Sequence, residues 1–463
     1  MRGGSSVATV ESYIAQNEGK FLEGLREFLR IPSISALPEH ASDMVRCAEF
    51  AAEKMKSLGM TNARVMSTGG HPIAYAEWLG APGAPTVLVY GHYDVQPVDP
   101  LNLWVSPPFD PQVRDNELYA RGAVDDKGQV YMHWSAIEAH MKVNGRLPIN
   151  LKFFVEGEEE IGSEHLDSFL SENLELLKAD VAVISDSAWL GHGIPSITYG
   201  LRGLSYLQVD LKGPDSDVHS GSFGGTIANP AQVLCEMIAA LKNSRGRVIV
   251  PGFYDKVRPI GAEERRQLAS LPFDEEKYRE DLGVPELYGE EGYTTLERQW
   301  ARPTLEVNGI WGGFTGEGSK TVLPSLASAK LSCRLVPDQD PEEILRLVTA
   351  RLLELCPPTV TMEVRPMHTG KPALTRTDHP AVQAAARAME RAFQKRPAFI
   401  RSGGTVPVVA SMAELLGVPA VLMGIGLPDE HSHAPNERLD LGNFFGGIRA
   451  AAFLWDELAK QGA

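Results

Sequence analysis

The sequence predicts an α/β protein in which a domain with a largely parallel sheet flanked by helices is interrupted by a smaller, ferredoxin-like α+β domain. Three observations predict this fold class. Short, mostly apolar segments alternate with helical patterns near both ends of the chain, as buried parallel strands and their connecting helices do. In the middle of the chain, apolar and polar residues alternate instead, which is typical of a sheet with one face in water. A chain of 463 residues is also too long for one ordinary core.

The first part of the chain predicts two helices followed by buried strands. An amphipathic helix is expected over residues 10–30, and a second helix is expected to end near Gly59. Mostly apolar strands are expected at residues 86–90, 151–155 and 181–185. A helix with one apolar face separates the first two strands, which favours an α/β domain.

The pattern changes at about residue 205. The elements that follow are expected in the order strand, helix, strand, strand, helix, strand, which is the ferredoxin-like arrangement. Residues 244–300 are rich in Glu and Arg and are expected to form an insertion in this order, with no role assigned. The strands are expected at residues 207–211, 304–310, 327–335 and 360–364, and the helices begin at Asn229 and Asp340.

The α/β pattern resumes after the inserted domain. A helix carries Val382 and Phe393, a buried strand is expected at residues 418–424, and a closing helix begins near Asn443. We therefore expect one discontinuous domain formed by residues 1–204 and 376–463. The second domain would be formed by residues 205–375.

Composition excludes several classes of partner. Asp and Glu number 60 against 44 Lys and Arg, which gives a net charge of −16, and such a surface repels nucleic acid. The four cysteines lack C-x-x-C spacing, which argues against both a disulfide framework and a thiolate zinc site. No apolar run has the length of a membrane span or of a signal peptide. We expect a cytoplasmic protein without membrane contact.

Side chains that can bind metals follow each predicted strand of the discontinuous domain. Taken singly, each has an ordinary structural explanation, such as a hydrogen-bonded His-Asp pair, a solvated glutamate or a helix-capping carboxylate. Active sites of open α/β sheets lie at the carboxyl ends of strands, so these side chains can meet. Imidazoles and carboxylates without cysteine favour a catalytic zinc site open to water. The candidates that follow strands are His92, Asp94, Glu159, Glu160, Asp186 and His433, and Asp125 opens the helix between the first two strands.

Several motifs carry a resemblance to a known family. They include VLVYGHYDVQPV at residues 87–98, LYARGAVDDKG at 118–128, EGEEEIGS at 156–163 and HAPNE at 433–437. In this order they resemble the di-zinc aminoacylase and dipeptidase family, and most of all its carnosine-dipeptidase branch of cytosolic nonspecific dipeptidases. The likeness covers nearly the whole chain and is weakest in the insertion. It implies a metal-dependent hydrolase of dipeptides.

The resemblance implies two divalent ions per subunit, bridged by Asp125. Zinc is favoured, with manganese or cobalt as alternatives. His431 lies two residues from one ligand, but the Asn-Glu pair at family spacing selects His433. The implied ligands of one ion are His92 and Asp186, and those of the other are Glu160 and His433.

The resemblance also implies catalytic roles. Glu159 would be the general base, and Asp94 would hold the ring of His92 through its second nitrogen. His219, from the inserted domain, would donate a hydrogen bond to the oxyanion. A cis peptide bond is implied between Asp125 and Asp126.

Substrate recognition is implied for residues of the inserted domain and of a late loop. Arg334 suits a substrate carboxylate because its planar fork binds carboxylates with two hydrogen bonds, although a surface ion pair would explain it equally well. The resemblance adds His368, Thr321, and the backbone at Gly404 and Thr405. It also implies that the inserted domain is a lid and dimerisation domain, and that a homodimer donates His219 in trans.

Other functions stay open at this point. An N-acyl amino-acid deacylase of desuccinylase or deacetylase type would share the metal centre, and only Asp in place of Glu at position 186 favours a dipeptidase. A catalytically inactive scaffold would lack some of the metal ligands or the general base, whereas all of these candidate residues are present. The preferred dipeptide side chains do not follow from the sequence.

Overall fold

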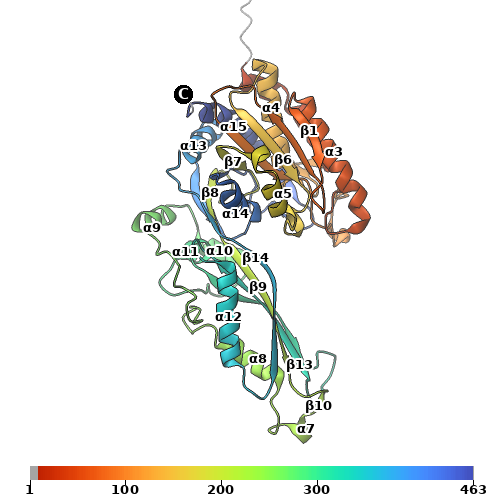
Figure 1. Cartoon of the computed structure of the whole chain (residues 1–463), viewed down its shortest axis with the longest axis vertical. Helices are drawn as coiled ribbons and strands as arrows, with labels where there is room; N and C mark the ends of the chain where they lie inside the picture. The colour runs from red at the N-terminus through yellow and green to blue at the C-terminus, as the bar shows by residue number, and fades with distance from the viewer. Residues whose placement is uncertain (1–8, 462–463) are drawn as a thin grey trace, which may run out of the picture. The chain divides into compact units, whose positions relative to one another are not determined.

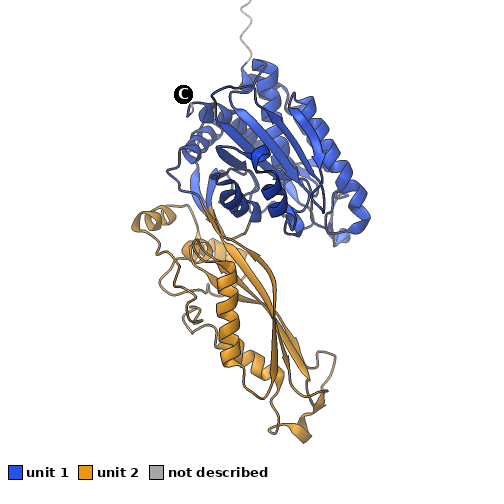
Figure 2. Ribbon diagram, in the orientation of Figure 1, with its two compact units in different colours: residues 1–199, 375–400, 407–463 blue, residues 200–374, 401–406 orange. Residues whose placement is uncertain are grey.

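The computed structural model describes residues 9–461 of the chain, which divides into two compact units (Figure 2). The first unit comprises Met1–Tyr199, Thr375–Ile400 and Pro407–Ala463, and the second comprises Gly200–Leu374 and Arg401–Val406. The chain therefore leaves the first unit twice and returns to it twice. That the first unit is catalytic and the second a lid remains a prediction.

A nine-stranded mixed sheet has the order β1-β2-β6-β3-β7-β17-β8-β15, with β16 also paired to β8. The central strands β6, β3, β7 and β17 are parallel, but β1, β2, β8 and β15 pair antiparallel. The sheet is therefore parallel only at its centre. The strands are β1 (Thr61–Met66), β2 (Ile73–Trp78), β3 (Thr86–His92), β6 (Asn150–Glu156), β7 (Val181–Ile184), β8 (Ser196–Leu201), β15 (Ala373–Leu374), β16 (Ala398–Ser402) and β17 (Ala420–Leu422).

Helices cover this sheet and form the larger core with it (Figure 1). Every residue of α4 from Lys127 to His140 is buried, which is typical of a helix enclosed on all sides. The helix expected over residues 10–30 is two helices, because the chain bends at Asn17, whose side chain donates to the carbonyl of Tyr13. The main helices are α1 (Val10–Gln16), α2 (Glu18–Leu29), α3 (Ala41–Ser57), α4 (Lys127–Asn144), α13 (Pro380–Phe393) and α15 (Leu441–Ala459).

The second unit contains a four-stranded antiparallel sheet of order β11-β13-β9-β14. Its elements follow one another as β9, α8, β11, β13, α12 and β14, which confirms the ferredoxin-like order. Buried side chains alternate along β9 and pack with α8 and α12 in a second core. The bounds are β9 (Gly203–Lys212), α8 (Pro230–Ala239), β11 (Thr304–Gly312), β13 (Leu326–Leu335), α12 (Pro341–Leu355) and β14 (Thr361–Gly370).

The segment between α8 and β11 belongs to the second unit. It carries α9 (Ala262–Ala269), α10 (Glu275–Asp281) and α11 (Thr295–Trp300), and its residues Val250 and Phe253 join the second core. No helix among residues 9–461 has both the length and the apolar character needed to cross a bilayer.

The short segment Arg401–Val406 belongs to the second unit, whereas the sequence placed it with residues 376–463 in the first. Hydrogen bonds explain the difference. The backbone N–H of Arg202 donates to the carbonyl of Ser402 over 3.3 Å, and the hydroxyl of Thr405 donates to the carbonyl of Arg202 over 2.7 Å. Such contacts between distant segments cannot be inferred from local patterns.

Candidate metal centre

The candidate ligands lie at the carboxyl ends of the central strands. His92 is the last residue of β3, Asp186 follows β7, and Glu159 and Glu160 begin a short 3-10 helix (Glu159–Ile161) after β6. Asp125 lies just before α4. Because β6, β3 and β7 are adjacent and parallel, their ends meet at one edge of the sheet. His433, from the loop after β17, joins them there.

These side chains form two groups whose possible ligand atoms lie within 4.8 Å of one another. Asp125 faces both groups. Its Oδ1 lies 3.1 Å from Nε2 of His92, and its Oδ2 lies 3.0 Å from Nε2 of His433. This placement suits a carboxylate that bridges two cations. The first group is His92, Glu159 and Asp186, and the second is Asp125, Glu160 and His433.

The charges of the cluster favour cations. Burial, together with the charge of Asp125, raises the pKa of Asp186 to about 7, and burial also raises the pKa of Glu159 well above its usual value. Hydrogen bonds to Asp125 and Glu160 raise the pKa of His433 to about 10. Crowded, buried carboxylates that resist ionisation are stabilised by divalent cations. The residues present therefore fit a pair of metal ions.

Asp94 contacts Nδ1 of His92, the ring nitrogen that does not face Asp125. Nδ1 of His92 lies 3.1 Å from the backbone oxygen of Asp94 and 3.3 Å from its Oδ1, and both side chains are fully buried. Oδ2 of Asp94 accepts a hydrogen bond from the backbone of Glu160 over 3.1 Å. This arrangement points Nε2 of His92 at Asp125 and supports the role expected of Asp94. The peptide bond between Asp125 and Asp126 is cis, as expected.

The sequence did not reveal how the loop that carries Asp125 is supported. The carboxylate of Glu437, which is fully buried, accepts hydrogen bonds from the backbone N–H groups of Gly122, Val124 and Asp125 over 3.0, 3.1 and 3.2 Å. It also binds Nη1 of Arg121 over 2.8 Å. Glu437 had served only as a spacing marker for His433, because its partners lie more than 300 residues away in the sequence.

We expect Glu437→Gln to destabilise the protein by about 3 to 5 kcal/mol, because it leaves the buried guanidinium of Arg121 without its charge partner. The unfolding midpoint in urea should fall, and metal affinity should weaken with it. Glu53→Gln serves as the control, since Glu53 forms an exposed ion pair with Lys56 that contributes little. An unchanged midpoint for Glu437→Gln would contradict this account.

Gln96 is a second residue that the sequence did not reveal. Its Nε2 donates to Oε2 of Glu160 over 2.8 Å and to the backbone oxygen of Glu160 over 3.2 Å. The amide therefore orients this carboxylate, as residues behind a metal ligand commonly do. Only its place in the motif at residues 87–98 could have indicated it.

The remaining predicted residues all lie in the second unit. Nη1 of Arg334 donates to the hydroxyl of Thr405 over 3.0 Å. The ring of His368 stacks on Tyr206, with 4.9 Å between ring centroids. The structure therefore brings Arg334 and the side chain of Thr405 into direct contact, and their role in substrate binding stays a prediction.

His219 and Thr321 form a separate pair in the second unit. Nε2 of His219 lies 3.3 Å from the hydroxyl of Thr321, and its Nδ1 accepts from the backbone of Gly221 over 3.0 Å. His219 ends the two-residue strand β10 (Val218–His219), which pairs with β12 (Val322–Leu323). Gly404 makes a different contact, because its backbone N–H donates to the hydroxyl of Ser402 over 3.1 Å.

Comparison with known sequences places the chain among peptidases. Residues 88–457 match the profile of Peptidase family M20/M25/M40. The chain is 34% identical over 456 residues to the Cys-Gly metallodipeptidase DUG1 of Candida albicans, with 94% of each chain covered. It is 32% identical over 468 residues to the Beta-Ala-His dipeptidase of Homo sapiens, which covers 97% of this chain and 92% of that one.

Solved structures show the same fold. Human carnosine dipeptidase 1 aligns with a TM-score of 0.83 and 32% identity, covering 97% of this chain and 98% of that one. The M20 family metallo-carboxypeptidase Sso-CP2 from Sulfolobus solfataricus aligns with a TM-score of 0.85 and 34% identity, covering 95% and 99% of the two chains. These matches confirm the predicted fold class and the family resemblance of the sequence motifs.

Proposed function

Because the chain belongs to peptidase family M20/M25/M40, we propose that it hydrolyses the peptide bond of dipeptides with two divalent metal ions. The observation that carries this proposal is Asp125, whose two carboxylate oxygens face the histidines of two separate ligand groups. Relatives with full-length similarity are named as dipeptidases, which supports the substrate class.

Five side chains would hold the ions. Asp125 would be shared between both ions, since one of its oxygens lies near His92 of the first group and the other near His433 of the second. Zinc suits imidazole and carboxylate ligands, and manganese or cobalt suits them as well. When bound, the ions would supply the positive charge that polarises a peptide carbonyl and eases deprotonation of water. Besides Asp125, the ligands would be His92 and Asp186 for one ion, and Glu160 and His433 for the second.

Glu159 would move the proton in this reaction. It follows β6 beside the ligand groups, and its raised pKa favours acceptance of a proton from water. The same carboxyl group would then return the proton to the departing amine. Arg334, with Thr405 and the backbone at Gly404, would hold the substrate carboxylate, because a guanidinium binds it with two charge-assisted hydrogen bonds.

The second unit would supply the donor to the oxyanion from a second copy of the chain. His219 is exposed and lies in the second unit, whereas both ligand groups lie in the first. Strands β11 and β14 are the two edges of the four-stranded sheet, and symmetric pairing covers such edges. We therefore include a homodimer in the proposal, with His219 acting in trans.

Subunit mixing tests this part of the proposal. His219→Ala and Glu159→Gln chains should each be inactive, but donation in trans gives every mixed dimer one intact site. After complete exchange of equal amounts, we expect about a quarter of wild-type activity to return. A mixture that stays inactive, although exchange is demonstrated with labelled chains, contradicts donation in trans.

The proposed reaction is tested with a panel of substrates. The protein is loaded with zinc or manganese, and free amino acids are measured after incubation with dipeptides and with N-acetyl and N-succinyl amino acids. We expect turnover of the dipeptides. Turnover of the N-acyl amino acids alone would identify a deacylase instead. A cytoplasmic location also stays part of the proposal, and the four cysteines, all free in the structure, are compatible with it.

A further inference from the structure

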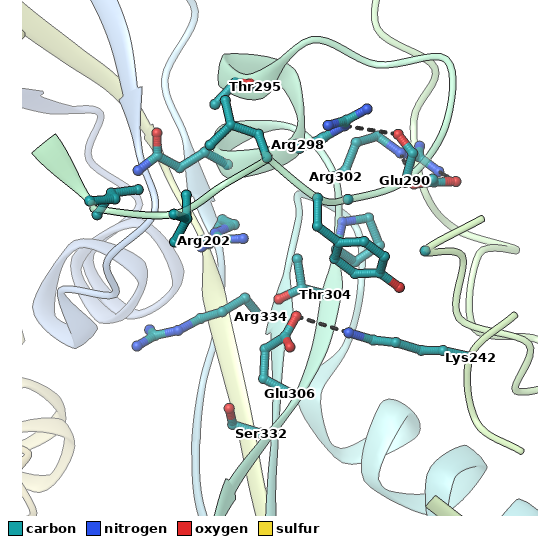
Figure 3. Close-up of a pocket in the computed structure, with 18 of the residues that line it drawn as sticks. Arg202, Lys242, Glu290, Thr295, Arg298, Arg302, Thr304, Glu306, Ser332 and Arg334 are labelled. Atoms are coloured by element: carbon teal, nitrogen blue, oxygen red, sulfur yellow. Dashed lines mark hydrogen bonds and ion pairs between the residues drawn. The ribbon is translucent and has the colours of Figure 1, made fainter. Parts of the chain in front are cut away.

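A cavity of about 600 Å³ lies in the second unit between its sheet and the inserted segment. Thr304 and Glu306 of β11 and Ser332 and Arg334 of β13 line one side. Residues of α10 and α11 line the other side, and Figure 3 shows Thr295 and Arg298 of α11. The insertion, to which the sequence assigned no role, therefore closes a cavity beside the arginine expected to bind the substrate carboxylate.

A second arginine of this cavity, Arg202, is attached to the same short segment as Arg334. Nε of Arg202 donates to the carbonyl of Gly403 over 3.2 Å, and Nη1 of Arg334 donates to Thr405 over 3.0 Å. Arg202 directly precedes β9, in which Leu204 pairs with Arg334. The two guanidinium groups are thus anchored beside the segment that the sequence assigned to carboxylate binding.

Neither guanidinium forms an ion pair within residues 9–461, although both side chains are half-buried. Two other basic residues of the cavity do form ion pairs, since Arg302 pairs with Glu290 over 2.7 Å and Lys242 pairs with Glu306 over 3.0 Å. Arg298 donates to the backbone oxygen of Glu290 over 3.0 Å. Burial, and then the positive charge of Arg334, lower the pKa of Arg202 to about 10. Glu306 lines the same cavity and offsets part of this positive charge, but its carboxylate already pairs with Lys242. Two neighbouring, partly desolvated cations that form no ion pair of their own favour an anionic ligand.

We infer that Arg202 binds a second carboxylate of the substrate, on the side chain of the C-terminal residue, so that the enzyme prefers dipeptides ending in Glu or Asp. This inference rests on the proposed function, in which Arg334 holds the terminal carboxylate. The two carboxylates of a C-terminal Glu or Asp are a few bonds apart, which suits two arginines anchored on one segment. The hydroxyl groups of Thr304 and Ser332 line the same cavity and add neutral donors.

The test compares Ala-Glu with Ala-Gln, which differ by one charge at nearly constant shape. In the wild-type enzyme, kcat/KM should be about tenfold or more higher for Ala-Glu, as expected of a hydrogen bond to a charged group. Arg202→Gln should bring this ratio close to one, because it should lower kcat/KM for Ala-Glu far more than for Ala-Gln. Arg202→Lys keeps the charge and should retain part of the preference.

Arg245→Gln is the matched control, because it removes one positive charge from the second unit at an exposed ion pair with Glu291. It should keep the wild-type ratio. A ratio near one in the wild-type enzyme contradicts the inference without any variant, so a misfolded Arg202→Gln chain would not prevent the test. An equal loss on both substrates in folded Arg202→Gln also contradicts it. Failure of the wild-type enzyme to hydrolyse any dipeptide would instead overturn the proposed function.

Discussion

Glu159→Gln should lower kcat for dipeptide hydrolysis by roughly 10²- to 10⁴-fold, the range that general acid–base catalysis contributes. Glutamine has nearly the shape of glutamate but cannot accept the proton of water at neutral pH. In the proposed assignment Glu159 moves protons and holds no ion, so metal content and KM should change little. The measurements are steady-state kinetics on one dipeptide and metal analysis of the same preparation.

The neighbouring Glu160→Gln gives the matched comparison. Nε2 of His433 lies 3.1 Å from Oε2 of Glu160, so this substitution should weaken one metal site while leaving the proton-transfer group in place. Glu159 lies within the ligand group of His92 and Asp186, so the metal content of the two variants distinguishes a base from a ligand. Loss of metal in Glu159→Gln, with full metal in Glu160→Gln, would exchange the two roles.

Asp125→Asn should abolish measurable hydrolysis by removing the charge that the two ions share. Each oxygen of Asp125 faces the histidine of a different group, so a neutral amide weakens both sites at once. We expect metal content to fall from about two ions to well below one per chain.

Asp167→Asn is the control for this substitution, since it removes one carboxylate from an exposed position of the first unit. It should retain metal and activity. Circular dichroism should show that Asp125→Asn keeps its fold, because the hydrogen bonds of Glu437 to the neighbouring backbone remain. A folded Asp125→Asn protein that still carries two ions would contradict a bridging role.

The sequence predicted the central strands well because their apolar runs are continuous. Residues 86–90, 151–155 and 181–185 correspond to β3, β6 and β7. The antiparallel strands β1 and β2 were not predicted. Strand β1 is largely exposed on both faces, so it has no apolar period that would reveal it.

Most candidate ligands could be predicted because they follow strands whose ends are visible in the sequence, whereas Asp125 lies at the start of a predicted helix. The side chains that orient these ligands could not be predicted. Glu437 and Gln96 act through hydrogen bonds to segments far away in the chain, and such contacts exist only once the fold is formed. The proposed role of Arg202 could not be predicted either, because its surroundings depend on the inserted segment and on residues 401–406. Residues 401–406 lie about 200 residues from Arg202 in the sequence.

Titration of metal-free enzyme with zinc or manganese tests the central claim most directly, because it counts the ions that activity requires. Protein dialysed against a chelator should be inactive toward dipeptides. Activity should return on addition of the ion and reach its plateau at about two equivalents per chain, as a site with a shared carboxylate requires. Full activity at one equivalent, or activity that survives complete metal removal, would contradict a two-metal centre at Asp125.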